Sequence, residues 1–408
     1  MERCYYIGID MDDSNAIISY YQTGMSEPET LSPVAGSEVF QIPLLLAKKK
    51  GIGQWFIGEE AKRIALQQNE EPFDNLLGKA LEEQTVVVEE KTYDAKDLLA
   101  LYLKKLILFA SRLGNPGMPD ILVITLEKLS RELTQLFGTI AEKLGIDKKQ
   151  MLLLDRRESF YYFAYNQKKE LWMRDMYLFD YRADEVKCYS IERNLKTVPQ
   201  MVTITEQAHI MDKNNPDECF YRILNECLNG RILSAVYLVG NGFDGDWMKV
   251  SLAFLCRGRR AFIGKNLYSK GACYAALVKK EQIAWPYVYM GDNELKINVS
   301  LKVKSGGTLQ FLTLISAGEN WYEALGECEV ILEGTPEVDF WLQLPNSREA
   351  KIQKLELADI PERQDKTTRL RISAKPVSDT EIKIVIRDLG FGEIVKASDK
   401  IWEYTMSL

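Results

Sequence analysis

Two segments of the chain repeat one pattern, in which a short apolar run ends in an aspartate and is followed by a polar turn and a second run. The first segment is Ile7-Gly-Ile-Asp10, with its second run at 16–21. The other is Tyr177-Leu-Phe-Asp180, with its second run at 186–191. Short apolar runs joined by a polar turn predict β-hairpins. We therefore expect two hairpins, each with an aspartate at the end of its first strand.

The first 287 residues alternate between apolar runs and segments with helical spacing. Runs typical of buried strands occur at 5–10, 40–47, 54–57, 120–125, 151–154, 176–180 and 235–239. Helical spacing occurs at 58–65, 94–113, 130–144, 158–166, 217–228 and 271–280. We expect the stretch at 194–216 to be irregular. Alternating strands and helices predict an α/β architecture.

From about residue 288 apolar and polar residues alternate strictly. The alternation runs through 295–303, 338–344, 370–374 and 382–386, with Gly and Pro between the segments. A period of two over several short strands predicts an antiparallel sandwich or barrel. Trp321, Tyr322 and Trp341 either line a groove in this part or belong to its core. The boundary falls within 286–292 and gives domains at 1–287 and 288–408.

Composition excludes several kinds of chemistry. The net charge of −7 argues against a nucleic-acid partner, because neutralising phosphates needs a surplus of Lys and Arg. The single histidine, His209, rules out metal centres that need two imidazoles, and we interpret it as a structural or surface residue. The seven cysteines are widely spaced and form no C-x-x-C motif, which indicates buried free thiols in a reducing compartment.

No targeting or membrane-spanning segment is predicted. The sequence after Arg3 is an apolar strand and lacks the pattern of a signal peptide. The most apolar helical segment, 98–109, is too short to cross a bilayer and contains Lys104 and Lys105. We therefore expect a cytoplasmic protein without a membrane span.

Six further segments accompany the two hairpins in a fixed order. They are Ile42-Pro-Leu-Leu-Leu-Ala, Phe56-Ile-Gly-Glu-Glu-Ala-Lys, Leu122-Val-Ile-Thr, Glu158-Ser-Phe-Tyr-Tyr-Phe-Ala-Tyr, Leu238-Val-Gly-Asn-Gly and Lys270-Gly-Ala-Cys-Tyr-Ala-Ala. Together they resemble the nucleotide-binding domain of the actin-like ATPase superfamily, and within it the DnaK-type heat-shock chaperones, over roughly the first 280 residues. A looser match, which includes Arg369-Leu-Arg-Ile-Ser-Ala and Asp388-Leu-Gly-Phe-Gly, resembles the last strands of the chaperones' β-sandwich substrate-binding domain.

The resemblance implies an actin-like (ribonuclease-H-like) α/β domain of two lobes, about 1–175 and a reduced 176–287, followed by an antiparallel β-sandwich without a helical lid. It also implies that ATP or ADP binds with Mg²⁺. In such a site Asp10 and Asp180 would handle the metal and would be the catalytic residues of an active enzyme. Asp12 would lie in the first phosphate loop, and Gly240 and Gly242 would form the adenosine loop.

Both phosphate loops depart from the family pattern. The first, Asp-x-Gly-Thr-Thr in the family, reads Asp10-Met-Asp-Asp-Ser, and the second, Asp-x-Gly-Gly-Gly, reads Asp180-Tyr-Arg-Ala-Asp. Glycine lets backbone N–H groups approach phosphates in dihedrals that side chains resist. The added carboxylates repel phosphate oxygens, by about 1 kcal/mol per pair at 4 Å in water and about 4 kcal/mol at a dielectric constant of 20. Arg182 offsets part of this repulsion.

These departures favour a DnaK-like pseudo-ATPase, an inactive protein without a cofactor that binds a protein or peptide partner through its β domain or serves as a scaffold. Asp10 and Asp180 would then only cap backbone amides at strand ends. The alternative is a divergent Mg-dependent ATPase, a chaperone or filament former, in which Asp10, Asp12 and Asp180 hold the metal. A third interpretation starts from Asp10-x-Asp12, which is similar to the nucleophile loop of haloacid-dehalogenase-type phosphatases. The partner, the pathway and the oligomeric state stay open.

Overall fold

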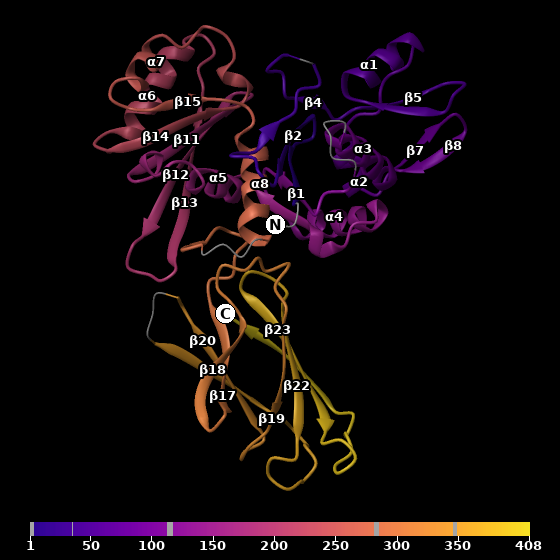
Figure 1. Ribbon diagram of the computed structural model, residues 1–408, viewed down its shortest axis with the longest axis vertical. Helices are drawn as coiled ribbons and strands as arrows, with labels where there is room; N and C mark the ends of the chain where they lie inside the picture. The colour runs from indigo at the N-terminus through magenta and orange to yellow at the C-terminus, as the bar shows by residue number, and fades with distance from the viewer. Residues whose placement is uncertain (1–3, 35, 112–116, 281–284, 346–348) are drawn as a thin grey trace. The chain divides into compact units, whose positions relative to one another are not determined.

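The computed structural model describes residues 4–34, 36–111, 117–280, 285–345 and 349–408 (Figure 1). The chain divides into two compact units. The first unit comprises Met1–Glu192 and Ile204–Trp285, and the second comprises Arg193–Thr203 and Pro286–Leu408. Helices and strands alternate in the first unit, whereas the second is built from strands. The mixed α/β part and the β-rich part expected from the sequence are therefore both present.

The first sheet of the first unit has the strand order β10-β9-β1-β2-β3. Its strands are β1 Tyr5–Met11, β2 Asn15–Gln22, β3 Glu29–Thr30, β9 Ile121–Leu126 and β10 Met151–Asp155. β1 and β2 form the predicted antiparallel hairpin, while β9 and β10 run parallel to β1. All seven residues of β1 are buried, as an apolar run in a covered sheet requires.

The second sheet repeats this order as β15-β14-β11-β12-β13. Its strands are β11 Asp175–Arg182, β12 Glu185–Asn194, β13 Gln200–Ile210, β14 Leu233–Val239 and β15 Ala261–Ile263. β11 and β12 are again an antiparallel hairpin, and β14 and β15 run parallel to β11. The expectation of an irregular stretch at 194–216 is wrong, because the 11-residue strand β13 lies within it. Each sheet thus has a strand with an aspartate near its end, flanked by an antiparallel hairpin partner on one side and by two successive parallel strands on the other.

Two long-range connections join these sheets. Helix α5, Arg156–Tyr165, follows β10 of the first sheet, yet Phe160 and Phe163 pack edge-on against Tyr237 of β14 in the second. Helix α8, Leu267–Lys280, follows β15 of the second sheet and packs back onto β1 of the first. The two helices lie side by side between the sheets (Figure 1). Each sheet is therefore covered by a helix that follows a strand of the other.

The remaining elements of the first unit flank these layers. The helices are α1 Gly58–Gln67, α2 Leu76–Leu81, α3 Ala95–Ser111, α4 Arg131–Leu144, α6 Pro216–Leu228 and α7 Val250–Leu255, and the short strands are β4 Ile42–Pro43, β5 Leu46–Lys49, β6 Gln54–Ile57, β7 Thr85–Val88 and β8 Lys91–Asp94. The prediction of one strand at 40–47 is wrong, since β4 ends at Pro43, which has no N–H to continue a ladder. Among the described residues, none of the helices has the length and apolar character needed to cross a bilayer.

The second unit contains two four-stranded antiparallel sheets around one hydrophobic core. Their orders are β18-β17-β20-β21 and β19-β22-β23-β24. The strands are β17 Asn298–Ser305, β18 Thr308–Ile315, β19 Gly326–Ile331, β20 Glu337–Gln343, β21 Ala350–Glu356, β22 Arg369–Pro376, β23 Glu381–Gly390 and β24 Ile401–Ser407. Fully buried Phe340, Ile372 and Ile384 come from three of them. The predicted period-two alternation is confirmed here. A short strand, β16 Tyr287–Tyr289, pairs with residues 200–202 of β13 in the same unit.

The crossing of α5 and α8 depends on a glycine. A Cβ atom at Gly271 of α8 would overlap the carbonyl oxygen of Ser159 in α5, and the Ser159 hydroxyl donates a hydrogen bond of 2.6 Å to the Tyr268 carbonyl. We predict that Gly271→Ala lowers the free energy of unfolding by about 1–3 kcal/mol, the range for overpacked cores. Urea denaturation followed by circular dichroism measures the change.

Gly138→Ala is the matched control. Gly138 lies inside α4, where the nearest atom to an added Cβ is Lys148 Cε at 3.9 Å. Alanine there should raise the free energy of unfolding by up to about 1 kcal/mol, because it is the better helix former. Equal shifts for the two variants would contradict a close helix crossing.

Candidate functional site

The sequence-predicted aspartates lie together where the central strands of both sheets end. Asp10 is the penultimate residue of β1, and Asp12 starts the turn after it. Asp180 lies near the end of β11, and Gly240 follows the parallel strand β14 directly. Carboxyl ends of parallel strands share one edge of a sheet, which is the usual place for a ligand site in α/β folds.

A buried arginine that the sequence interpretation did not include occupies the centre of this site. Arg156 is the first residue of α5, directly after β10, and it is only 3% exposed, as is Asp10. Its Nε donates to Asp10 Oδ1 at 3.0 Å, and its Nη2 lies 3.4 Å from Asp12 Oδ2. Its guanidinium also lies 5.3 Å from the centre of the Tyr268 ring, a cation–π distance.

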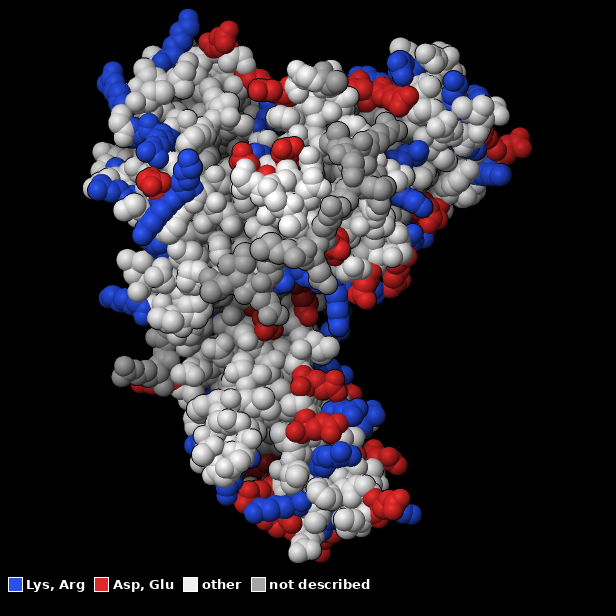
Figure 2. All heavy atoms as spheres, viewed as in Figure 1, with Lys and Arg blue, Asp and Glu red and all other residues white. Residues whose placement is uncertain are grey.

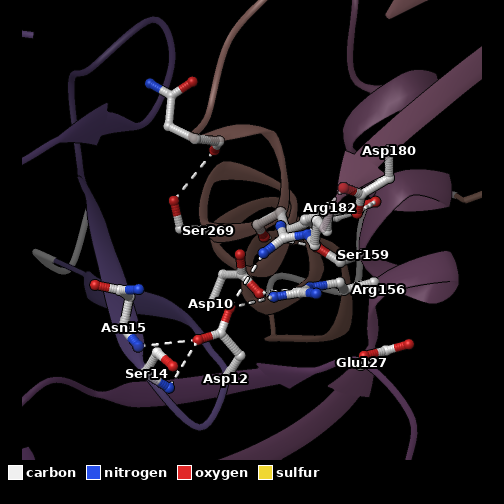
Figure 3. A network of polar contacts seen from close by, with 12 residues as sticks. Asp10, Asp12, Ser14, Asn15, Glu127, Arg156, Ser159, Asp180, Arg182 and Ser269 are labelled. Carbon is white, nitrogen blue, oxygen red and sulfur yellow. Dashed lines mark hydrogen bonds and ion pairs between the residues drawn. The ribbon is translucent and has the colours of Figure 1, made fainter. Parts of the chain in front are cut away.

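Arg182 continues the network toward the second sheet. Its Nη1 donates to Asp12 Oδ2 at 3.1 Å, and its Nε donates to Asp180 Oδ1 at 2.8 Å. The other oxygen of Asp180 accepts a hydrogen bond of 2.9 Å from the Tyr268 hydroxyl of α8. Figure 3 shows both guanidiniums pointing into the space between the three carboxylates. We call Asp10, Asp12, Arg156, Asp180 and Arg182 the arginine lock.

The charges of the lock support one another. Burial raises the pKa of Asp10, and Arg156 and Arg182 oppose that rise. Burial works against the charge on Arg156, but Asp10 and Asp180 outweigh it and raise the pKa of Arg156 above its ordinary value. Burial also raises the pKa of Tyr268, which therefore keeps the proton that it donates to Asp180. Arg156 therefore stays charged at neutral pH.

Both carboxylate oxygens of Asp12 accept hydrogen bonds. Oδ2 accepts from the two arginines, and Oδ1 accepts from the backbone amides of Ser14 and Asn15 at 3.0 and 2.9 Å. The second pair of bonds is the Asx-turn pattern that closes a tight hairpin. Asp12 therefore holds the β1–β2 turn as well as the arginines.

The glycines of the expected adenosine loop pack against β11. A Cβ atom at Gly240, whose φ is +99°, would lie 2.8 Å from Asp180 Oδ1, and one at Gly242 would overlap the Tyr181 ring. Tyr181 in turn contacts Phe243 and Trp247 edge-on. Gly240 thus lies beside the lock, whereas Gly242 lies behind Tyr181 in an aromatic core. Both glycines are explained by close backbone approach.

The cavity inside the lock is too small for a nucleotide. The cavity between Asp10, Asp12, Arg182, Gly240 and Asn241 has a volume of about 10 Å³, which is about one water molecule. A more open depression of about 260 Å³ lies outside it and is lined by Asp12, Asp13 and Arg182, among others. Pockets that bury a ligand usually measure about 300–1,000 Å³.

Magnesium and ATP, which the resemblance implies, do not fit the residues present. The carboxylates that would hold the metal already accept from arginines. Within the described ranges, no three His, Cys, Asp or Glu side chains are grouped so that they could hold a metal ion. We therefore assign no chemical step to a metal or a nucleotide at this site.

Arg156 could have been found from its position in the sequence. It lies two residues after the apolar run at 151–154, which was expected to be a strand, and it precedes the helix expected at 158–166. Polar residues at such junctions lie at the carboxyl edge of a parallel sheet. The sequence pattern does not give the direction of the side chain, so the contact with Asp10 required the structure.

The fold and the lock together define an α/β domain of two sheets. The aspartates at the carboxyl ends of its central strands are paired with arginines of the same domain. The chain belongs to a family of unknown function (DUF5716), whose C-terminal family model matches residues 27–292. A domain of unknown function (DUF8552) matches residues 294–408. No curated protein matches the sequence. The two matched ranges meet close to the boundary between the units at Trp285 and Pro286.

The lock should make a large contribution to stability. Removing one partner of a buried ion pair leaves an uncompensated charge and costs about 3–5 kcal/mol. We predict a loss of that size for Arg156→Ala, and a smaller loss for Arg156→Lys, which keeps the charge but not the forked donors. Urea denaturation of the purified variants measures both.

Arg63→Ala is the control for loss of an arginine charge. Arg63 makes a 3.5 Å pair with Glu60 on the surface of α1, where both side chains are more than half exposed. Exposed pairs contribute about 0–1 kcal/mol. If Arg156→Ala were no less stable than Arg63→Ala, the lock would not be a structural element.

Proposed function

We propose that the first unit is an actin-like, DnaK-type domain that no longer binds or hydrolyses ATP, and that the protein is a scaffold whose β unit binds a protein or peptide. The duplicated strand order supports the fold assignment, because each sheet has a hairpin with an aspartate near the end of its first strand and two parallel strands in the same order. The reciprocal packing of α5 and α8 on the two sheets is a second argument for it.

The arginine lock is the observation that carries the proposal. In a phosphoryl-transfer site the aspartates must be available to a divalent cation, and the phosphates need backbone N–H groups. Here Arg156 and Arg182 bind these carboxylates, and the cavity beside them holds about one water. Two arginine side chains of the protein, and not a bound metal ion, therefore neutralise Asp10, Asp12 and Asp180.

The lock also replaces a ligand as the link between the two sheets. Asp10 and Asp12 come from the first sheet, Arg182 and Asp180 from the second, and Arg156 from the start of the crossing helix α5. These side chains contact each other directly, so no bound ligand is needed to hold the sheets together at this edge. A domain of this kind keeps the same surface whether or not nucleotide is present, which suits a scaffold.

The β unit offers an apolar face on an edge strand. Leu309 and Phe311 of β18 are 66% and 57% exposed, and the Phe311 ring contacts Trp341 of β20 edge-on at 5.2 Å. Ile352 pairs with Trp341 across β20 and β21 and is also exposed. β18 is the end strand of its sheet, so one side of its backbone is available to pair with another strand.

Charge is distributed unevenly on the β unit. Figure 2 shows side chains of both signs gathered over β22 and β23, where Arg371 pairs with Glu329 and Lys383 pairs with Glu403 across neighbouring strands. On the other sheet, the ammonium group of Lys302 lies 5.4 Å from the centre of the Trp341 ring. An extended apolar peptide would therefore be accommodated over β18 and β20, while the β19-β22-β23-β24 face stays solvated.

Calorimetry with nucleotides tests the inactive site. We expect titration of Mg-ATP and of Mg-ADP into the full chain to give no binding with a dissociation constant below about 10 μM. An active DnaK-type chaperone measured in parallel is the positive control. Binding tighter than that limit, together with phosphate release that Asp10→Ala and Asp180→Ala abolish, would support a divergent ATPase instead.

Fluorescence anisotropy with a labelled, Leu-rich heptapeptide tests the β unit. We expect saturable binding that Phe311→Asp weakens by about tenfold or more, equivalent to about 1.4 kcal/mol. Ile394→Asp is the matched control, because Ile394 is 82% exposed in the same unit but lies outside the face. Equal weakening by the two substitutions, or no saturable binding, would contradict a peptide site on β18.

A further inference from the structure

The single histidine of the chain lies against a pair of cysteines. Cys188 comes from β12, Cys227 from the last turn of α6, and His209 from the end of β13. The Cys227 sulfur lies 3.6 Å from His209 Nε2. Cys227 packs against the hydrophobic core cluster to which Cys188 belongs, and the two thiols share a hydrogen bond. Both cysteines are free thiols.

The two thiols differ in exposure. Cys188 is 3% exposed and belongs to the hydrophobic core of the second sheet, whereas Cys227 and His209 are half-buried at the edge of that core. A reagent from solution therefore reaches Cys227 before Cys188. This arrangement resembles a reacting thiol with a second thiol placed behind it to complete a disulfide.

The protonation states favour the same division of roles. The hydrogen bond from Cys188 lowers the pKa of Cys227, against the effects of burial and of Glu226. The same bond, together with burial, raises the pKa of Cys188. The titratable groups around the pair are Tyr177 from β11, His209 from β13 and Glu226 from α6. Elsewhere, burial raises the pKa of Cys328 to about 11, so that thiol stays protonated.

We propose that Cys227 and Cys188 form a redox site that reduces a hydroperoxide and closes to a disulfide between α6 and β12. His209 Nε2 accepts the proton of the Cys227 thiol. The Cys227 thiolate attacks one peroxide oxygen, the O–O bond breaks, and the leaving oxygen takes the proton from His209 and departs as water or an alcohol. Cys227 is then a sulfenic acid.

Cys188 completes the reaction. Its sulfur attacks the Cys227 sulfur, the S–O bond breaks, and the hydroxide leaves with the Cys188 proton as water. Two thiols are thereby oxidised by two electrons, and one hydroperoxide is reduced to water and an alcohol, or to two waters when it is hydrogen peroxide. Two external thiols then reduce the disulfide by exchange, which restores both cysteines and leaves the external thiols joined as a disulfide. Since none of these atoms belongs to the arginine lock, the site is independent of the proposed function.

Treatment of the reduced full chain with one equivalent of hydrogen peroxide tests the proposal. We expect two of the seven thiols to disappear from a titration in denaturant, and the intact mass to fall by two hydrogen atoms. Peptide mapping should link Cys188 to Cys227, and dithiothreitol should restore both thiols. A disulfide between any other cysteines, or no disulfide, would overturn the proposal.

Variants separate the roles of the three residues. Cys188→Ser should stop at a Cys227 sulfenic acid that dimedone traps, and His209→Gln in that background should slow trapping by about tenfold. Cys256→Ser, which removes an exposed thiol elsewhere, should leave disulfide formation unchanged. Equal trapping rates with and without His209 would exclude the histidine from the reaction. Dimedone labelling of another cysteine in place of Cys227 would exclude the assigned thiol, and circular dichroism confirms that each variant is folded.

Discussion

The buried ion pair between Arg156 and Asp10 is the interaction on which the first unit depends. Asp10 lies next to the end of the central strand of one sheet, and Arg156 begins the helix that crosses to the other, so their 3.0 Å contact ties the start of α5 to β1. Burying a charge costs several kcal/mol unless it is paired and hydrogen-bonded. Arg156 meets that condition only because Asp10, Asp12 and the Tyr268 ring surround it together.

The network at the strand ends requires arginine, and not lysine, at positions 156 and 182. Arginine presents five donors in a fixed fork, so Arg156 and Arg182 each contact two carboxylates, which a lysine ammonium would serve less completely. Asp12, whose charge argued against phosphate in the sequence, is bonded to both guanidiniums. The negative charges of the two acidic loops are therefore neutralised by arginines of the same chain. One of these arginines, Arg156, contacts Asp10 and Asp12, and the sequence pattern did not include it.

Much of the architecture could be predicted from the sequence because one face of each strand is buried. Period-two alternation at 338–344 and 370–374 corresponds to β20 and β22. β13 was missed because most of its residues are at least partly exposed, so its Thr, Glu, Gln and His positions show no apolar alternation. Arg156 was missed for a different reason: its role depends on a residue 146 positions away, and an arginine in an apolar context is normally exposed.

The lock and the cysteine pair lie on opposite faces of one strand pair, which makes them physically separable. In the β11–β12 ladder Phe179 is opposite Cys188, and Asp180 is opposite Lys187. Successive side chains of a strand point to opposite faces, so Cys188 lies in the core under α6 while Asp180 faces Tyr268 of α8. A disulfide bond between Cys188 and Cys227 would join β12 to α6 on the face of the sheet opposite Asp180. It would leave every contact of Asp180 in place. The scaffold and the thiol chemistry can therefore coexist in one fold.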